Sequence, residues 1–112
     1  MAYVPAQGDV VSIDFDPQSG YEQAGRRPAL VLSTLAYNKL TGLAVLCPIT
    51  KKGKGYKFEV PIPEGYAVYG VILADQVKSM SWLTRDTQYV CLLPTSTVKN
   101  VVERVNALIK VE

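Results

Sequence analysis

Residues 20–33 read G-Y-E-Q-A-G-R-R-P-A-L-V-L-S, and they join a polar, glycine-containing loop to an apolar strand. Pro28 fixes the entry to the strand over residues 29–33, whose nearly unbroken apolar composition predicts a central strand buried on both faces. The preceding segment, residues 17–27, is too long and polar for a tight turn and is expected to be a loop. Long loops in small domains are often functional, so the stretch predicts a sheet with a functional loop at its edge.

Six other segments have the composition of strands, with either alternating or continuous apolar residues. They are residues 9–16, 43–50, 58–62, 71–74, 75–83 and 88–93. Pro61 and Pro63 place the strand over 58–62 at an edge of the sheet, because proline cannot donate to the hydrogen-bond ladder. Asp75 and Gln76 are expected to begin a strand with one solvent-facing side.

Two segments have helical spacing. Residues 34–41 can form about two turns of helix, with Leu35, Ala36 and Leu40 on one face and Gly42 as the stop. The second helix is C-terminal and amphipathic, and its apolar residues are Val98, Val101, Val102, Val105, Leu108 and Ile109.

Pro94 closes the β region, and Thr95 or Ser96 is expected to cap the C-terminal helix. The pattern as a whole predicts a mainly β or α+β fold. We expect a small, strongly curved antiparallel sheet or SH3-like barrel, with the C-terminal amphipathic helix and one or two short helices packed on it.

The 112 residues are 48% hydrophobic and 20% charged, which is ordinary for one soluble domain spanning 1–112. No apolar run approaches the roughly 20 residues of a membrane-spanning helix. Residues 1–8 lack the basic and apolar regions of a secretory signal, so a cytoplasmic location without membrane contact is expected.

The two cysteines, Cys47 and Cys91, both lie in apolar strand-like segments. They lack C-x-x-C spacing, and the chain contains no histidine that would complete a mixed zinc site. Buried, reduced thiols are therefore expected, and neither a disulfide nor a metal site is predicted.

Positive charge is concentrated rather than abundant, because the formal net charge is only +2. One short segment carries Lys51, Lys52, Lys54 and Lys57, and the pair Arg26–Arg27 forms a second cluster. Two local basic sites can bind a polyanion without making the whole protein basic. A solvated, flexible turn is the alternative explanation for the lysines.

The arginine cluster also contains a carboxylate, since Glu22 precedes Arg26 and Arg27 in the same loop. A surface salt bridge that steadies the loop is the simplest explanation, and such pairs are common and weak. Two adjacent arginines are nevertheless costly unless an anion neutralises them. Phosphate suits them because a guanidinium fork matches two of its oxygens. Thr50, at the end of a predicted strand, can either satisfy its own backbone or donate to that phosphate.

Three further polar residues, Asp75, Gln76 and Lys78, can hydrogen-bond to base edges, although an ordinary polar sheet face is the alternative. Aromatic side chains can stack on bases. Most of them are expected to cover the core; this group includes Tyr66, Tyr69 and Trp82. Tyr21 and Tyr56 are the expected exceptions, because they lie in the basic loops.

Three motifs, in order and with matching spacing, carry a family resemblance. They are D-F-D-P-Q-S-G-Y-E-Q-A-G-R-R-P-A-L-V-L-S at residues 14–33, C-P-I-T-K at 47–51 before the basic loop, and A-D-Q-V-K-S at 74–79. The chain resembles the PemK/MazF family of toxin-antitoxin endoribonucleases from about residue 3 to the last helix. The resemblance implies a CcdB/PemK-like barrel, a two-fold homodimer, and metal-independent cleavage of single-stranded RNA without a cofactor. It also implies inhibition by a cognate antitoxin.

Carried onto this sequence, the resemblance assigns catalysis to Glu22, Arg27 and Thr50. The residues expected to bind RNA are Tyr21, Gln23, Arg26, Lys51, Lys52, Lys54, Tyr56, Lys57, Asp75, Gln76 and Lys78. As a hypothesis, the ribose 2'-hydroxyl attacks the adjacent phosphorus, with Glu22 as base, and leaves a 2',3'-cyclic phosphate and a 5'-hydroxyl. The proton for the leaving oxygen can come from water, Tyr21 or Arg27.

Two other functions fit the same fold. One is a non-enzymatic toxin that poisons a protein such as DNA gyrase through its terminal helix. The other is a nucleic-acid-binding module without catalysis, which predicts salt-sensitive RNA binding and no product. The expected antitoxin presents an acidic, partly disordered segment that lies across the basic groove and competes with RNA.

Overall fold

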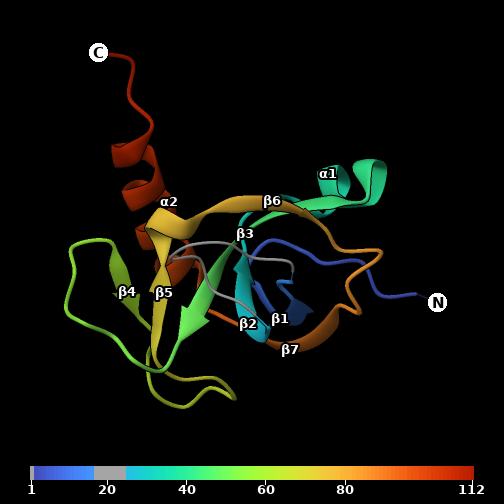
Figure 1. Cartoon of the computed structure of the whole chain (residues 1–112), viewed down its shortest axis with the longest axis horizontal. Helices are drawn as coiled ribbons and strands as arrows, with labels where there is room; N and C mark the ends of the chain where they lie inside the picture. The colour runs from blue at the N-terminus through green and yellow to red at the C-terminus, as the bar shows by residue number, and fades with distance from the viewer. Residues whose placement is uncertain (1, 17–24) are drawn as a thin grey trace.

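The computed structural model describes residues 2–16 and 25–112. The described elements follow one another as β1 (Asp9–Asp14), β2 (Arg26–Val31), α1 (Leu35–Thr41), β3 (Leu43–Thr50), β4 (Glu59–Pro61), β5 (Val71–Leu73), the 3-10 turn η1 (Ala74–Gln76), β6 (Lys78–Ser81), β7 (Gln88–Leu92) and α2 (Thr95–Leu108). In Figure 1 the strands form the centre of the molecule, with α1 and α2 on different sides of it. The described part has no helix with the length and apolar character needed to cross a membrane.

The strands make a single antiparallel sheet in the order β4-β5-β3-β2-β1-β7, with β6 paired to β3 beside this path. β3 is the longest strand, and it pairs with β2, β5 and β6. The mainly β fold with an antiparallel sheet and a C-terminal helix is confirmed. β4 lies at the end of the strand order, as its prolines predict.

β2 is a central strand buried on both faces. Ala29, Leu30 and Val31 are all fully buried, but they belong to two different core clusters. Leu30 packs in the cluster that includes Val10 of β1, while its two neighbours pack in the cluster that includes Phe15. Side chains alternate across a strand, so an unbroken apolar run supplies both cores. Burying one such leucine contributes about 2 kcal/mol.

β2 begins earlier than predicted. Its ladder with β1 continues past Pro28 and pairs Arg27 with Ile13 and Arg26 with Asp14. The prediction that both arginines lie in a loop was therefore wrong, and they belong to the first two positions of an interior strand. The prediction fails because Pro28 does not begin the strand: it lies inside the ladder opposite Ser12, and the strand begins two residues earlier.

α1 has the predicted ends but not the predicted buried face. The Thr34 side chain accepts from the Tyr37 backbone N–H, and Gly42 ends the helix in a left-handed conformation with φ of 72°. Leu40 is 85% exposed, so the expected apolar face does not pack on the sheet. Asn38 is buried instead, and its side-chain amide donates to the backbone oxygens of residues 5 and 33. A polar network therefore anchors this helix.

α2 packs against η1 and β4, and its Val98 and Val101 are buried in the same core cluster as Val60 and Ala74. The predicted amphipathic helix is therefore confirmed in its first turns. Two details were wrong. The residue before the helix is Pro94, with no side-chain cap, instead of Thr95 or Ser96 acting as the cap. Leu108 and Ile109 are exposed, because the end of the helix extends beyond the sheet (Figure 1).

The predicted strand over 75–83 is also corrected. Ala74–Gln76 forms the 3-10 turn η1, and the strand begins only at Lys78. The Ala74 N–H donates to the Phe58 carbonyl, and α2 packs on the same turn. Asp75 and Gln76 are thus held on a short, supported turn between two strands that both pair with β3.

Candidate functional site

The described part of the chain contains an open pocket of about 1140 Å³, which we call the groove. Its lining residues are Ser12, Arg26, Arg27, Pro28, Ile49, Thr50, Lys51, Lys52, Lys54, Tyr56, Glu59, Ala67, Val68, Tyr69, Leu73, Asp75, Gln76 and Val90. Arginines and lysines outnumber carboxylates in this lining. The groove is therefore a basic surface, as the two clusters in the sequence predict.

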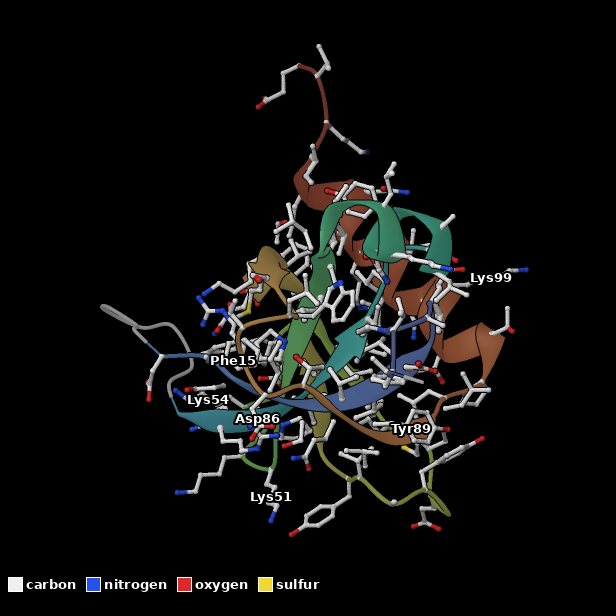
Figure 2. The ribbon with its side chains drawn as sticks, turned by 90° about the vertical axis from the view of Figure 1, so that its right-hand side faces the viewer. Phe15, Lys51, Lys54, Asp86, Tyr89 and Lys99 are labelled. Carbon is white, nitrogen blue, oxygen red and sulfur yellow. The ribbon has the colours of Figure 1, made fainter. Side chains whose placement is uncertain are left out.

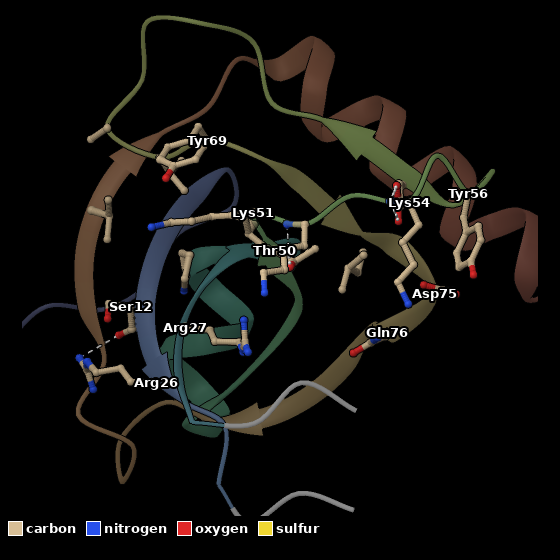
Figure 3. A pocket seen from close by; sticks show the side chains of 18 residues that line it. Ser12, Arg26, Arg27, Thr50, Lys51, Lys54, Tyr56, Tyr69, Asp75 and Gln76 are labelled. Atoms are coloured by element: carbon tan, nitrogen blue, oxygen red, sulfur yellow. Dashed lines mark hydrogen bonds between the residues drawn. The ribbon is translucent and has the colours of Figure 1, made fainter. Parts of the chain in front are cut away.

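Arg27 and Thr50 lie at the centre of the groove in Figure 3. Strand geometry explains why they meet. β2 and β3 are antiparallel neighbours that pair Ala29 with Pro48, and both Arg27 and Thr50 lie two residues from that pair, toward the groove. Two distant segments of the sequence thus place a guanidinium and a hydroxyl in the same groove.

Thr50 is held by two independent contacts. Its hydroxyl accepts a hydrogen bond of 3.2 Å from the Lys52 backbone N–H, and Thr50 pairs with Val71 of β5. Gly70, just before that strand, has φ of 115°, and a Cβ placed there would lie 2.2 Å from the Thr50 carbonyl oxygen. Only glycine allows the two backbones to approach this closely.

Arg26 also lines the groove, but its guanidinium is already engaged. It donates to the backbone oxygens of Ser12 and Asp86 and pairs with the Asp86 carboxylate at 3.4 Å. Neighbouring strand residues point to opposite faces, so Arg26 and Arg27 are directed differently. Arg26 therefore connects β2 to the turn before β7, which gives it a structural contact that the sequence did not indicate.

The loop over residues 51–57, which carries four lysines, has exposed lysine side chains and a backbone held by hydrogen bonds. The backbone N–H groups of Lys54 and Gly55 donate to the Glu59 carboxylate at 2.9–3.0 Å, and Arg104 of α2 donates to the Lys57 carbonyl. Lys51 and Lys54 are exposed and lie on the other side of the molecule from Lys99 of α2 in the view of Figure 2. An ordered backbone that carries solvent-exposed lysines suits binding to phosphates.

Asp75 and Gln76 project from η1 into one end of the groove, together with Lys54 and Tyr56 (Figure 3). Tyr56 is 63% exposed, in agreement with the prediction that it does not cover the core. This end therefore combines a carboxylate, an amide and an exposed ring, the groups that read and stack a nucleobase.

Two predicted residues do not line the groove. The Lys57 ammonium lies 6.0 Å from the Phe58 ring centre, and the Lys78 ammonium lies 5.8 Å from that of Phe15. Three others, Tyr21, Glu22 and Gln23, lie outside the described residues.

Tyr69 is the groove residue that sequence reasoning misassigned. It was expected to cover the core, yet it is 63% exposed and lines the groove, whereas Trp82 packs on the core as predicted. No signal in the sequence marks this position, because Tyr69 directly precedes Gly70, whose positive φ and close approach to Thr50 depend on the fold.

Neither cysteine adds reactive chemistry to the groove. Cys47 is buried, as predicted, whereas Cys91 is only half-buried, and neither is bonded to another cysteine. Burial raises the pKa of Cys47 to about 12, so its thiol is protonated at neutral pH. Within residues 2–16 and 25–112, no group of three or more His, Cys, Asp or Glu side chains is arranged to hold a metal ion.

Residues 6–109 match the model of a family described as PemK-like, MazF-like toxins of type II toxin-antitoxin systems. The chain belongs to the PemK/MazF toxin family. Among its relatives is the endoribonuclease toxin MazF of Escherichia coli K12, which is 44% identical over 107 residues covering 96% of each chain.

Solved PemK/MazF structures agree with this assignment. The crystal structure of MazF from Deinococcus radiodurans has a TM-score of 0.93 and 45% identity, over 96% of this chain and 97% of that one. A MazE–MazF structure from the same organism has a TM-score of 0.85 and 40% identity, over 96% of both chains.

Proposed function

We propose that this PemK/MazF toxin is an endoribonuclease that cleaves single-stranded RNA at short sequences in its basic groove. Cleavage of messenger RNA in the cytoplasm would stop translation and growth. The observation that carries the proposal is the pair Arg27 and Thr50, set together at the centre of an open basic groove. Support comes from the E. coli MazF relative, which is named an endoribonuclease toxin.

The reaction we propose begins with in-line attack of a ribose 2'-hydroxyl on the neighbouring phosphorus. The bond from phosphorus to the 5'-oxygen breaks, which leaves a 2',3'-cyclic phosphate and a 5'-hydroxyl. The nucleophile is part of the substrate, so the enzyme mainly aligns it and needs no metal to generate it. Arg27 and Thr50 donate hydrogen bonds to the phosphoryl oxygens as charge develops, an effect of about 3 kcal/mol for one well-placed donor.

Two proton transfers complete this mechanism. Glu22, five residues before Arg27, is the proposed base that removes the 2'-hydroxyl proton. Nearby guanidinium groups favour the ionised form of a carboxyl group, and this is the form that a base needs. The leaving 5'-oxygen takes a proton from water, Tyr21 or Arg27.

Product chemistry tests the proposal directly. A defined RNA treated with the wild-type protein should give 5'-hydroxyl and 2',3'-cyclic phosphate ends, identified by end-labelling and mass spectrometry. Replacing the 2'-hydroxyl at the mapped site by hydrogen should block cleavage while RNA of the same sequence still binds. Activity should survive EDTA. Cleavage of the deoxy substrate, or a requirement for a divalent ion, would contradict the mechanism.

The proposed partners follow from the same groove. An acidic, partly disordered antitoxin segment would lie across the lysines and exclude RNA, folding as it binds. A MazE–MazF complex has been solved for the D. radiodurans proteins, which supports a cognate antitoxin here. A two-fold homodimer would extend the binding surface beyond one groove, because RNA must be held on both sides of the cut.

A further inference from the structure

The side of the groove away from Asp75 and Gln76 carries a tyrosine, Tyr69, to which the proposed mechanism assigns no role (Figure 3). Tyr69 lines the groove, and the Lys51 ammonium lies 5.0 Å from the centre of its ring. Although a lysine is close, 63% of Tyr69 remains exposed. An exposed aromatic ring beside an ammonium group presents a stacking surface and a phosphate contact within one small area.

The backbone that carries this ring is fixed relative to Thr50. Gly70 approaches the Thr50 carbonyl so closely that a Cβ would lie 2.2 Å away, and the Gly70 carbonyl accepts from the Ile62 N–H at 3.0 Å. The next residue, Val71, pairs with Thr50 in the sheet. A ring attached to such a support keeps a defined position relative to the centre of the groove.

Tyr69 and Lys51 lie on the opposite side of the groove centre from Asp75 and Gln76. In Figure 3, Arg27 and Thr50 stand between this pair and the end that holds Asp75, Gln76 and Tyr56. A strand whose scissile phosphate sits at Arg27 and Thr50 has nucleotides on both sides of it. One side meets Asp75 and Gln76, and the other side meets Tyr69.

We propose that Tyr69 and Lys51 form a second base-binding subsite, on the opposite side of the scissile phosphate from Asp75 and Gln76. The ring of Tyr69 stacks on the base of that nucleotide, and the Lys51 ammonium contacts its phosphate. The inference rests on the proposed ribonuclease function and adds a substrate contact to it. The neighbouring lining residues Ala67 and Val68 have no side-chain hydrogen-bonding groups, so this subsite accepts any base.

The test uses an RNA oligonucleotide that spans a cleavage site mapped with wild-type protein, with one 2'-deoxy substitution to prevent cutting. Abasic nucleotides are placed in turn on each side of the scissile phosphate, and dissociation constants are measured by fluorescence anisotropy. The variants are Tyr69→Ala and Tyr69→Phe. Tyr66→Ala is the matched control, because Tyr66 is a partly exposed tyrosine of the same segment that does not line the groove.

We expect Tyr69→Ala to weaken binding about tenfold, while Tyr69→Phe and Tyr66→Ala bind as wild type does. One abasic position on the Tyr69 side should weaken wild-type binding by a similar factor and should have no further effect in Tyr69→Ala. Equal abasic effects in both proteins, or normal binding by Tyr69→Ala, would overturn the subsite. When wild type cleaves the all-ribose oligonucleotide, either of these two results overturns the subsite and leaves the proposed function standing. If wild type neither cuts nor binds RNA, the proposed function falls together with the subsite.

Discussion

Gly70 shows how one residue can fix the geometry of a site formed by others. Its φ of 115° lies in a region that side-chain-bearing residues rarely adopt, and its missing side chain leaves room for the Thr50 carbonyl. Thr50 is therefore held by its own strand and by a glycine twenty residues later in the sequence. The position of the threonine hydroxyl depends on both.

Gly70→Ala should lower the free energy of unfolding by about 2 kcal/mol or more and strongly reduce RNA cleavage, because the added Cβ displaces Thr50. Gly65→Ala is the matched control: its φ is 96°, but no atom lies within 4 Å of an added Cβ. In that variant, backbone strain alone should lower the free energy of unfolding, and RNA cleavage should be unchanged. Urea unfolding and cleavage assays measure both effects, and equal activity in the two variants would contradict this role of Gly70.

Cys47 provides a pH-dependent prediction. Burial, with a smaller contribution from the charge of Asp75, raises the pKa of its thiol from an ordinary 9.0 to about 12. The unfolded chain loses the thiol proton first, so the stabilisation is complete below pH 9 and is lost as the pH rises toward 12. The free energy of unfolding should fall more between pH 8 and pH 10 in wild type than in Cys47→Ala. Parallel pH profiles in urea unfolding would show that the thiol is not buried in this way.

The two ends of the undescribed segment 17–24 are joined by a small network around Arg85, a residue of the turn between β6 and β7. The Arg85 guanidinium donates to the carbonyls of Asp14 and Asp16 at 2.9 and 2.7 Å. The Gly25 N–H donates to the Asp16 carboxylate at 3.0 Å, and Phe15 donates to the Gly25 carbonyl. The turn thereby holds Asp16, which in turn binds Gly25; these are the described residues on either side of that segment.

Arg85→Ala should reduce kcat/KM for RNA cleavage by roughly tenfold, because the segment that carries Glu22 loses its anchor. The loss of two hydrogen bonds from a charged donor should also lower the free energy of unfolding, by about 3 kcal/mol. Thr84→Ala, at the exposed neighbouring position, is the control and should change neither quantity. An Arg85→Ala protein with full activity would disprove the anchoring role.

The elements also show what the sequence could predict. The apolar runs of β2 and β3 and the glycine at the end of α1 are local signals, and the corresponding strands and helix end were predicted correctly. The beginning of β2 at Arg26 depends on pairing with β1, and the buried face of α1 depends on the hydrogen bonds of Asn38. Such features arise between distant segments, so composition does not reveal them.

The candidate site likewise has residues that the sequence predicts and features that it does not. The residue types Arg27, Thr50 and Asp75 were predicted from motifs, and the structure brings them into one groove. The exposure of Tyr69 and the engagement of Arg26 by Asp86 could not be predicted, because they depend on the turn before β5 and on the turn before β7. No local pattern records those contacts.

Taken as a whole, the molecule is nearly neutral but strongly asymmetric, since its net charge is +2 and the groove gathers much of the positive charge. Binding to single-stranded RNA should therefore weaken with salt, with a slope of log K against log salt of about −0.7 for each phosphate contact. Lys54→Gln should make this slope shallower by about 0.7. Lys99→Gln, on the other side of the molecule, should leave it unchanged. Identical slopes in the two variants, measured with non-cleavable RNA, would exclude Lys54 from the RNA interface.

The most direct test of the proposed ribonuclease site is single-turnover cleavage of a defined RNA by Arg27→Ala, compared with Lys99→Ala. Both variants remove one positive charge, but only Arg27 lines the groove. Arg27→Ala should keep a wild-type circular dichroism spectrum and lose at least about a hundredfold in rate, while Lys99→Ala cleaves normally. Cleavage by Arg27→Ala at the wild-type rate, with the same product ends, would contradict the assignment of catalysis to this groove.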